Sequence, residues 1–226
     1  MPQPKFRFVV ATRASKDEFY RNTALGKSLS IFKNDEIDLY AENSDGLSTV
    51  YNRSIKKSVN DPAILIFIHD DIWLLDFFWS VRIISSLSQF DIIGIVGAQK
   101  RSPRQFSWVY KSDSYTIDRG NLSGLIGHGK GFPPNNMSYC GQVGIEVEIL
   151  DGVFIACKSE MLQDKRLKFD ERFDFHFYDM DFCRSAKLRG LKMGTSPISV
   201  IHESAGALDT PSWDKNRKAY FEKWGD

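Results

Sequence analysis

Residues 63–71 constrain the fold of this 226-residue chain more than any other stretch. Residues 63–68 are apolar without interruption, as in a central strand that is covered on both faces in an α/β sheet. The run ends at His69, Asp70 and Asp71, and open α/β sheets bind ligands beyond the carboxyl ends of their strands. Because strand side chains alternate, we expect His69 and Asp71 to share one face and Asp70 to point to the other. The pattern favours a divalent-cation site, although an Asp at this point can also simply cap the next helix.

The composition is that of an ordinary globular protein, with 42% hydrophobic and 26% charged residues. A chain of this length is expected to form one α/β domain. The formal net charge of +1 gives no electrostatic reason to expect a nucleic-acid partner. The sequence has neither the apolar core of a signal peptide nor an apolar run of membrane-spanning length, which predicts a cytoplasmic protein. Three cysteines without a C-x-x-C spacing favour reduced thiols over a disulfide framework or a zinc site.

The first 98 residues alternate between strand-like and helix-like patterns. Strands are expected at residues 5–11, 37–41, 63–68 and 90–98. Helices are expected at residues 17–32, 47–59 and 74–87. Such an alternation predicts a mostly parallel central sheet that is flanked by helices and wound through right-handed crossovers.

Residues 99–142 interrupt this regularity, because they are rich in Gly, Pro, Ser and Asn. A connection of this length inside a compact domain is usually a binding loop or a lid, and we expect it to border the binding cleft without a long regular element. Order returns at residues 143–157, which contain two β-rich runs. Asp151 and Gly152 lie between the runs, at a turn or bulge where the backbone can approach a ligand closely.

A second polar cluster precedes an amphipathic pattern that runs from about Asp181 to Gly190 and predicts a helix. Asp179 and Asp181 fall at the helix N-terminus, where the helix dipole favours ionised carboxylates at neutral pH. Because Asp is also a favoured N-cap, we expect one of the two to cap the helix and the other to act in chemistry.

The last predicted strand, residues 192–201, ends at His202. A lone His is more often structural than a ligand, yet His69 and His202 both follow apolar runs, so two strand ends are expected to offer ligands to one cation. Residues 213–226 predict a helix that packs an aromatic face on the body. The same helix could lie on a membrane surface, but Asp214 and Glu222 dilute the basic face that this alternative requires.

Four motifs occur in an order that resembles the family 2 glycosyltransferases of the GT-A fold. They are residues 63–71, residues 150–154, residues 173–189 and residues 200–202. The similarity spans about residues 6–224 and is greatest to the subgroup typified by the streptomycin-biosynthesis glycosyltransferase-like domain. It implies one GT-A-like domain with a nucleotide-sugar-binding half (1–98), a variable loop or lid (99–142), an acceptor and catalytic half (143–212) and a C-terminal helix (213–226).

The resemblance implies an inverting transfer from a nucleotide-sugar donor to a hydroxyl of a sugar or glycolipid acceptor, assisted by Mn²⁺ or Mg²⁺. Such a displacement needs a base near the acceptor hydroxyl and positive charge on the departing diphosphate. By position, Asp71 matches the family's metal-binding aspartate, His202 matches the late His of the metal site, and Asp179 matches the general base. The chain departs from the family at His69, which replaces the first acid of the Asp-x-Asp motif, and at Tyr178, which replaces the Glu before the base. Imidazole is an acceptable Mn²⁺ ligand.

The expected substrate contacts lie at strand ends and turns. Glu42 falls where the family usually has an Asp near the nucleobase. The full set of expected contacts is Thr12, Glu42, Asn43, Asn52, Asp70, Asp151, Gly152 and Asp181. The resemblance also implies a role in bacterial surface polysaccharide or glycoconjugate synthesis, in the cytoplasm or peripherally at the inner face of the cell membrane.

Two other classes of protein stay open at this point. His69 and Tyr178 favour a binding module of the same fold that binds nucleotide or sugar without turnover. A metal-dependent nucleotidyltransferase is disfavoured, because no Gly-rich basic segment follows the first strand. The products separate the three, since a glycosyltransferase releases a nucleoside diphosphate, a nucleotidyltransferase releases pyrophosphate, and a binding module releases neither.

Overall fold

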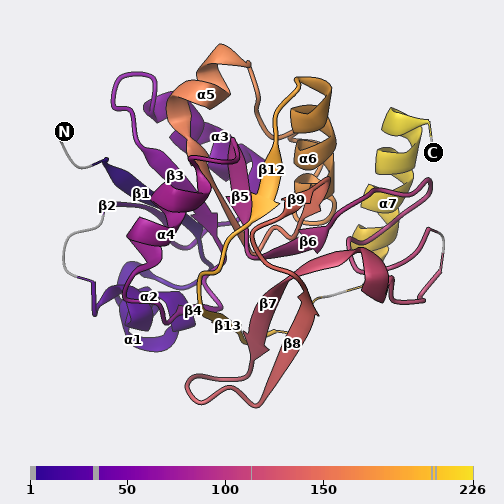
Figure 1. The fold of residues 1–226 in the computed structure, drawn as a ribbon. Helices are drawn as coiled ribbons and strands as arrows, with labels where there is room; N and C mark the ends of the chain where they lie inside the picture. The colour runs from indigo at the N-terminus through magenta and orange to yellow at the C-terminus, as the bar shows by residue number, and fades with distance from the viewer. Residues whose placement is uncertain (1–3, 33–35, 113, 205, 207, 226) are drawn as a thin grey trace.

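The computed structural model describes residues 4–32, 36–112, 114–204, 206 and 208–225, and its central layer is a seven-stranded sheet (Figure 1). In spatial order the strands are β2 (Glu36–Tyr40), β1 (Phe6–Ala11), β3 (Ile64–Ile68), β11 (Phe154–Lys158), β5 (Ile92–Gly94), β12 (Met193–Thr195) and β9 (Glu146–Val147). Strands β2, β1, β3, β5 and β12 run in one direction, whereas β11 and β9 run in the opposite one. The predicted α/β fold is therefore confirmed, with β11 as a reversed strand between β3 and β5.

A second sheet of six strands adjoins the first. Its path is β10 (Ile149–Leu150), β6 (Val96–Ala98), β7 (Leu122–His128), β13 (Val200–His202) and β4 (Ile72–Leu74), and β8 (Asn136–Gly141) pairs with β7. Short connections cross between the two sheets at residues 69–71, at Ile95, at residues 142–145, at Glu148, at residues 151–153 and at residues 196–199. Two of these crossings, 69–71 and 151–153, carry polar residues that the sequence singles out as a candidate site.

Helices cover both faces of the seven-stranded sheet, and the alternation along β3 shows how the faces divide. Leu65 and Phe67 join one hydrophobic core, whereas Ile64, Ile66 and Ile68 join the other. The first core is covered by α3 (Leu47–Lys57), α5 (Ser159–Asp164), α6 (Tyr178–Leu188) and α7 (Pro211–Trp224). The second core is covered by α1 (Lys16–Asn22), α2 (Ala24–Leu29) and α4 (Trp79–Ser86). Strand β3 is thus buried on both faces, as its apolar sequence predicts.

Two predicted helices are wrong in their extent. The pattern at residues 17–32 forms two helices, because the Thr23 hydroxyl accepts the N–H of Gly26 and starts α2. The pattern at residues 74–87 forms a helix only from Trp79 onward, since the preceding residues form β4 and pair with β13. The strand predicted at residues 90–98 is likewise divided into β5 and β6, one in each sheet.

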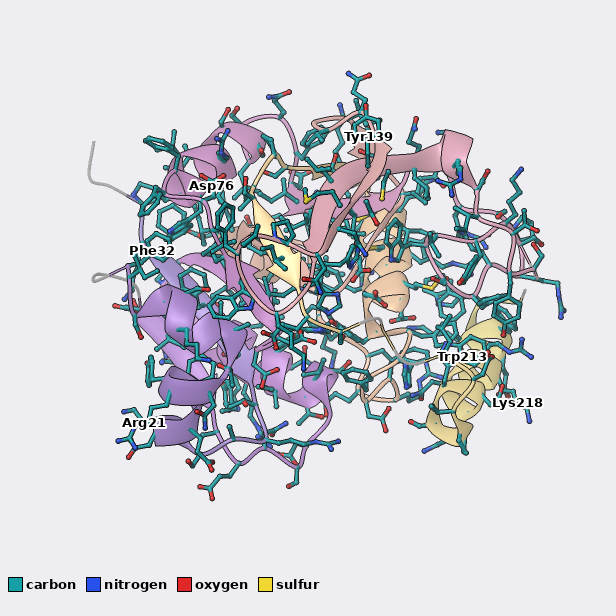
Figure 2. All side chains as sticks on the ribbon, turned by 90° about the horizontal axis from the view of Figure 1, so that it is seen from below. Arg21, Phe32, Asp76, Tyr139, Trp213 and Lys218 are labelled. Atoms are coloured by element: carbon teal, nitrogen blue, oxygen red, sulfur yellow. The ribbon has the colours of Figure 1, made fainter. Side chains whose placement is uncertain are left out.

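Residues 99–142 contain a regular hairpin, which corrects the expectation of an irregular loop. After a short 3₁₀ helix, η1 (Arg119–Asn121), strands β7 and β8 pair antiparallel, and Tyr139 projects from the outer edge of the hairpin (Figure 2). The glycine content of this segment does not indicate an irregular loop, because at least one glycine lies within a strand and allows close packing against the neighbouring backbone. Gly124 has a φ of 110°, and a Cβ on it would lie 2.2 Å from the Ile95 carbonyl oxygen.

The predicted C-terminal helix is α7, which packs one side on the body. Trp213 and Tyr220 are buried, whereas Lys218 lies on the opposite, exposed side (Figure 2). Residue 226, at the end of the predicted helix, lies outside the described residues. None of the helices in the described ranges combines the length and the apolarity that a membrane crossing requires.

Candidate functional site

Strand pairing in the second sheet brings the predicted metal ligands together. Residues 69–71 connect β3 to β4, and His202 of β13 pairs with Ile72 at the start of β4. As a result, ligand atoms of His69, Asp71 and His202 all lie within 4.8 Å of one another. His202 Nε2 lies 3.3 Å from Asp71 Oδ2, and the Ser204 hydroxyl lies 3.0 Å from the same nitrogen.

The donor atoms of this cluster fit a divalent transition metal. Asp71 Oδ1 is buried and has no hydrogen-bond partner among the described residues, so one ligand position is chemically unsatisfied. Burial opposes ionisation of Asp71, but the hydrogen bond and charge of His202 outweigh burial and lower the pKa of Asp71 to about 2. Burial also lowers the pKa of His69 and favours its neutral form, the form that binds metals. Two imidazoles and one carboxylate suit Mn²⁺ better than Mg²⁺, which prefers oxygen ligands.

Asp70 points away from this cluster, as the alternation along a strand predicts. Its Oδ2 accepts a hydrogen bond of 2.6 Å from the Thr12 hydroxyl at the end of β1. Thr12, Asn43 and Asp70 line a cavity of about 690 Å³, together with Asp174 from the segment before α6. Three predicted substrate residues, Thr12, Asn43 and Asp70, therefore line one compartment.

Asp179 lies in the first turn of α6. The residue before this helix, Phe177, has a left-handed conformation with a φ of 65°. Asp179 Oδ2 accepts the N–H of Gly152 at 2.9 Å, and its Oδ1 accepts the N–H of Met180 at 2.8 Å. Burial and the nearby charge of Asp151 raise the pKa of Asp179 to about 7, despite the backbone hydrogen bonds that oppose the shift. The raised pKa is opposite to the expectation that the helix dipole keeps Asp179 ionised at neutral pH. A pKa near neutrality suits a general base.

The Asp151–Gly152 turn approaches α6 closely. A Cβ on Gly152 would lie 2.2 Å from the Tyr178 hydroxyl oxygen, so this close approach requires a glycine. The sequence predicts that the backbone of this turn lies close to a ligand. In the structure, the side chain of Tyr178 also lies against this backbone. Asp151 Oδ1 accepts the N–H of Val153 at 2.9 Å, and its Oδ2 accepts the indole N–H of Trp108 at 2.5 Å.

A second cavity, of about 610 Å³, joins the two polar clusters. The chain has four histidines, and all four line this cavity: His69, His128, His176 and His202. Asp70, Asp71, Asp151, Gly152 and Asp179 line it as well. Because the two cavities share five lining residues, including Asp70, they form two compartments of one cleft.

The segment 99–142 supplies cleft residues that sequence patterns did not single out. Residues 106–110 provide an aromatic wall that includes Trp108, and the hairpin adds His128 from β7 and Ser138 from β8. The strand alternation of β7 could have revealed His128, because Leu125 is exposed whereas Ile126 and His128 line the cavity. The expectation that this segment borders the cleft therefore agrees with the structure.

Three residues predicted as substrate contacts lie outside both compartments. Glu42 is exposed, with a left-handed φ of 50°. Asn52 bonds the backbone of Phe169 through both its side-chain oxygen and its side-chain nitrogen. Asp181 is buried and accepts hydrogen bonds from Lys223 and Trp224 of α7. The side chains of Asn52 and Asp181 form hydrogen bonds with distant segments of the chain. The positions of these two residues therefore do not fit the expected substrate contacts.

The two adjoining sheets with flanking helices form a GT-A-like α/β fold. Residues 9–224 match the glycosyltransferase-like family, and the chain belongs to this family. No characterised protein sequence gave a significant match over the chain.

One solved structure supports the fold, and two others show a weaker similarity. A197 from STIV is similar with a TM-score of 0.51 and 10% identity, over 91% of this chain and 97% of that chain. S. aureus TarS gives a TM-score of 0.49 with 12% identity, over 89% of this chain and 37% of that chain. The TarS 1–349 structure gives a TM-score of 0.47 with 14% identity, over 88% of this chain and 60% of that chain. The chain thus spans only part of TarS, whereas it spans nearly all of A197.

Proposed function

We propose that the protein is an inverting glycosyltransferase that moves a sugar from a nucleotide-sugar donor to a hydroxyl of a sugar or glycolipid acceptor. One observation carries this proposal. A carboxylate with a pKa near 7, Asp179, lines the same cavity as the cluster of His69, Asp71 and His202. Inverting transfer needs these two elements, a base for the acceptor and a site for the charge of the leaving diphosphate.

Asp179 acts on the acceptor in this mechanism. Its carboxylate takes the proton of the acceptor hydroxyl while that oxygen bonds the anomeric carbon and the bond from this carbon to the diphosphate breaks. The N–H groups of Gly152 and Met180 hold the carboxylate in place, so little reorientation precedes the reaction. The aromatic wall that includes Trp108 offers a surface for the acceptor ring and excludes water from the base.

The donor occupies the other side of the cleft. Thr12, Asn43 and Asp70 line the compartment that is proposed to bind the nucleoside part. His69, Asp71 and His202 would hold a divalent metal, with Mn²⁺ a better fit than Mg²⁺. When bound, the metal supplies positive charge that stabilises the departing diphosphate.

The finer family assignment is part of the same proposal. The four motifs at residues 63–71, 150–154, 173–189 and 200–202 favour the streptomycin-biosynthesis glycosyltransferase-like subgroup, and with it a role in bacterial surface polysaccharide or glycoconjugate synthesis. A cytoplasmic location, or a peripheral one at the inner face of the membrane, would give such an enzyme access to nucleotide sugars and to glycolipid acceptors.

A panel of nucleotide sugars, with and without Mn²⁺, tests the proposal. Thermal shift identifies the donor, because a ligand that binds only the folded state raises Tm. Release of nucleoside diphosphate in the presence of sugar or glycolipid acceptors then shows transfer. Asp71→Ala should weaken Mn²⁺-dependent donor binding far more than Asp70→Asn, and equal Mn²⁺ dependence in both variants would place the metal elsewhere.

A binding module without turnover is the second candidate. It is favoured by His69 and Tyr178, which stand where the resemblance implies acids. This candidate predicts the same thermal shifts with no release of nucleoside diphosphate under any acceptor condition.

A further inference from the structure

The two departures from the family pattern contact each other. His69 Nε2 lies 2.8 Å from the Tyr178 hydroxyl oxygen, although the residues are 109 positions apart. The same hydroxyl donates a hydrogen bond of 2.8 Å to the Gly152 carbonyl oxygen. A ligand candidate of the metal cluster is therefore tied to the turn that also holds Asp179.

Hydrogen-bond chemistry assigns the protons of this chain of contacts. A tyrosine hydroxyl carries one proton, and the Gly152 carbonyl can only accept, so the Tyr178 proton lies on the Gly152 side. The Tyr178 oxygen must then accept from His69, which places the ring proton of His69 on Nε2. In a neutral imidazole with a proton on Nε2, only Nδ1 has a lone pair for a metal.

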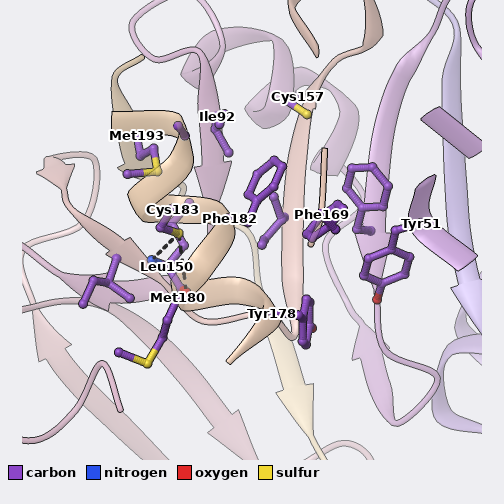
Figure 3. Packing of buried hydrophobic residues seen from close by; sticks show 14 of the residues in the cluster. Tyr51, Ile92, Leu150, Cys157, Phe169, Tyr178, Met180, Phe182, Cys183 and Met193 are labelled. Atoms are coloured by element: carbon purple, nitrogen blue, oxygen red, sulfur yellow. Dashed lines mark hydrogen bonds between the residues drawn. The ribbon is translucent and has the colours of Figure 1, made fainter. Parts of the chain in front are cut away.

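Packing fixes Tyr178 in the position that this assignment requires. Its side chain is buried, and its ring contacts those of Tyr51 and Phe169 at centroid distances of 5.8 and 6.0 Å (Figure 3). Gly152 leaves room for the hydroxyl, because any Cβ there would overlap it. The hydroxyl is therefore held in place before a metal binds.

We propose that Tyr178 is a positioning residue that locks His69 in the Nε2–H tautomer and so presents Nδ1 to a divalent transition metal. The two replaced positions then work as a pair, in which the imidazole serves as the ligand and the tyrosine orients it. Hydrogen-bonded partners of this kind orient metal-binding histidines in general. The inference rests on the metal site of the proposed function, and it adds that the pair shifts metal preference from Mg²⁺ toward Mn²⁺.

Tyr178→Phe tests the positioning role, and Tyr220→Phe is its control. Tyr220 is equally buried in the same core, and its hydroxyl lies 3.5 Å from Arg184 Nη1 instead of at the Tyr178 hydroxyl. Calorimetric titration with Mn²⁺ should show an affinity about 10–100-fold lower for Tyr178→Phe, and an unchanged affinity for Tyr220→Phe. Equal affinities of Tyr178→Phe and wild type would overturn the positioning role. Absence of Mn²⁺ binding by the wild-type protein would instead overturn the metal site and the inference together.

Nitrogen NMR of the protein labelled in histidine gives a readout that needs neither metal nor activity. The metal-free wild type should show His69 with its proton on Nε2, and Tyr178→Phe should lose this single tautomer. His69→Asp assigns the signal by its disappearance. A proton on Nδ1 of His69 in the wild type would refute the assignment even if metal binds.

His69→Asp also tests the metal preference. Restoring a carboxylate should raise the affinity for Mg²⁺ relative to Mn²⁺, and Tyr178→Phe should no longer affect Mn²⁺ affinity in this background. An unchanged ratio of Mg²⁺ to Mn²⁺ affinity in His69→Asp would show that His69 is not a metal ligand.

Discussion

Asp179 and Asp181 lie two residues apart in the first turn of α6 and face different parts of the molecule. Asp179 lines the cleft and is held by backbone N–H groups of Gly152 and Met180. Asp181 is only 1% exposed, and its Oδ1 lies 2.6 Å from Lys223 Nζ and 2.8 Å from Trp224 Nε1. Both carboxylates experience the same helix dipole, so the dipole cannot distinguish their roles. Their tertiary neighbours distinguish the two roles. Asp179 contacts a turn next to a cavity, whereas Asp181 contacts the C-terminal helix.

The largest expected effect separates the two residues by catalysis. Asp179→Asn keeps the shape of the side chain but removes the basic oxygen, so transfer should fall roughly a hundredfold or more. Folding should suffer little at pH 8, because the loss of one of the two backbone N–H bonds is offset by removal of a buried carboxylate that is ionised above its raised pKa of about 7. Turnover and Tm of the variant at pH 8 test both statements. A rate within a few-fold of wild type would remove Asp179 from the mechanism.

The next effect concerns stability on the opposite side of the helix. Asp181→Ala removes the acceptor that Lys223 and Trp224 share, but Lys223 keeps its contact of 2.8 Å with Asp170, so the free energy of unfolding should fall by about 1–3 kcal/mol. The rate per folded molecule should stay within a few-fold of wild type. Urea unfolding and turnover at a temperature where the variant is folded measure the two quantities. A selective loss of rate with unchanged stability would transfer the catalytic role to Asp181.

The contrast also shows which parts of the fold the sequence could predict. Strand β3 was predictable because burial on both faces demands an uninterrupted apolar run. The grouping of His69, Asp71 and His202 was predictable for a similar reason, since each follows the apolar run of a strand. The division of residues 90–98 between two sheets was not, because a buried strand and a crossing at Ile95 have the same apolar composition.

Roles that depend on distant partners could not be predicted from the sequence. Asn52 bonds the backbone of Phe169, which is 117 positions away, and no local pattern around Asn52 records this contact. The partners of Asp181 lie in α7, 42 and 43 positions further along the chain. A polar residue at a turn or helix start is equally suited to a ligand or to such a contact. Only the fold decides between the two.

A third prediction uses pH to sharpen the contrast. The pKa of Asp179 is raised to about 7, so the base loses its active, deprotonated form as pH falls below 7. With metal and substrates saturating, the rate should fall roughly tenfold per pH unit in this range. The residual rate of Asp179→Asn should lack this dependence, whereas that of Asp181→Ala should retain it. A wild-type rate that is independent of pH between 5 and 7 would contradict the assignment of Asp179 as the titrating base.

The smallest expected effect tests whether the two sides of α6 are energetically independent. Trp224→Phe removes the indole N–H that Asp181 accepts but keeps an aromatic ring and the Lys223 contact, so it should cost about 1 kcal/mol of unfolding free energy. In the Asp181→Ala background this loss should largely disappear, because the acceptor is already absent. In the Asp179→Asn background the loss should persist within about 0.5 kcal/mol, because Asp179 and Trp224 share no hydrogen-bond partner among the described residues. Urea unfolding of the three single and two double variants gives both coupling energies. Strong coupling between Asp179 and Trp224 would show that the C-terminal helix acts on the catalytic side of α6, and the separation of roles within this first turn would fail.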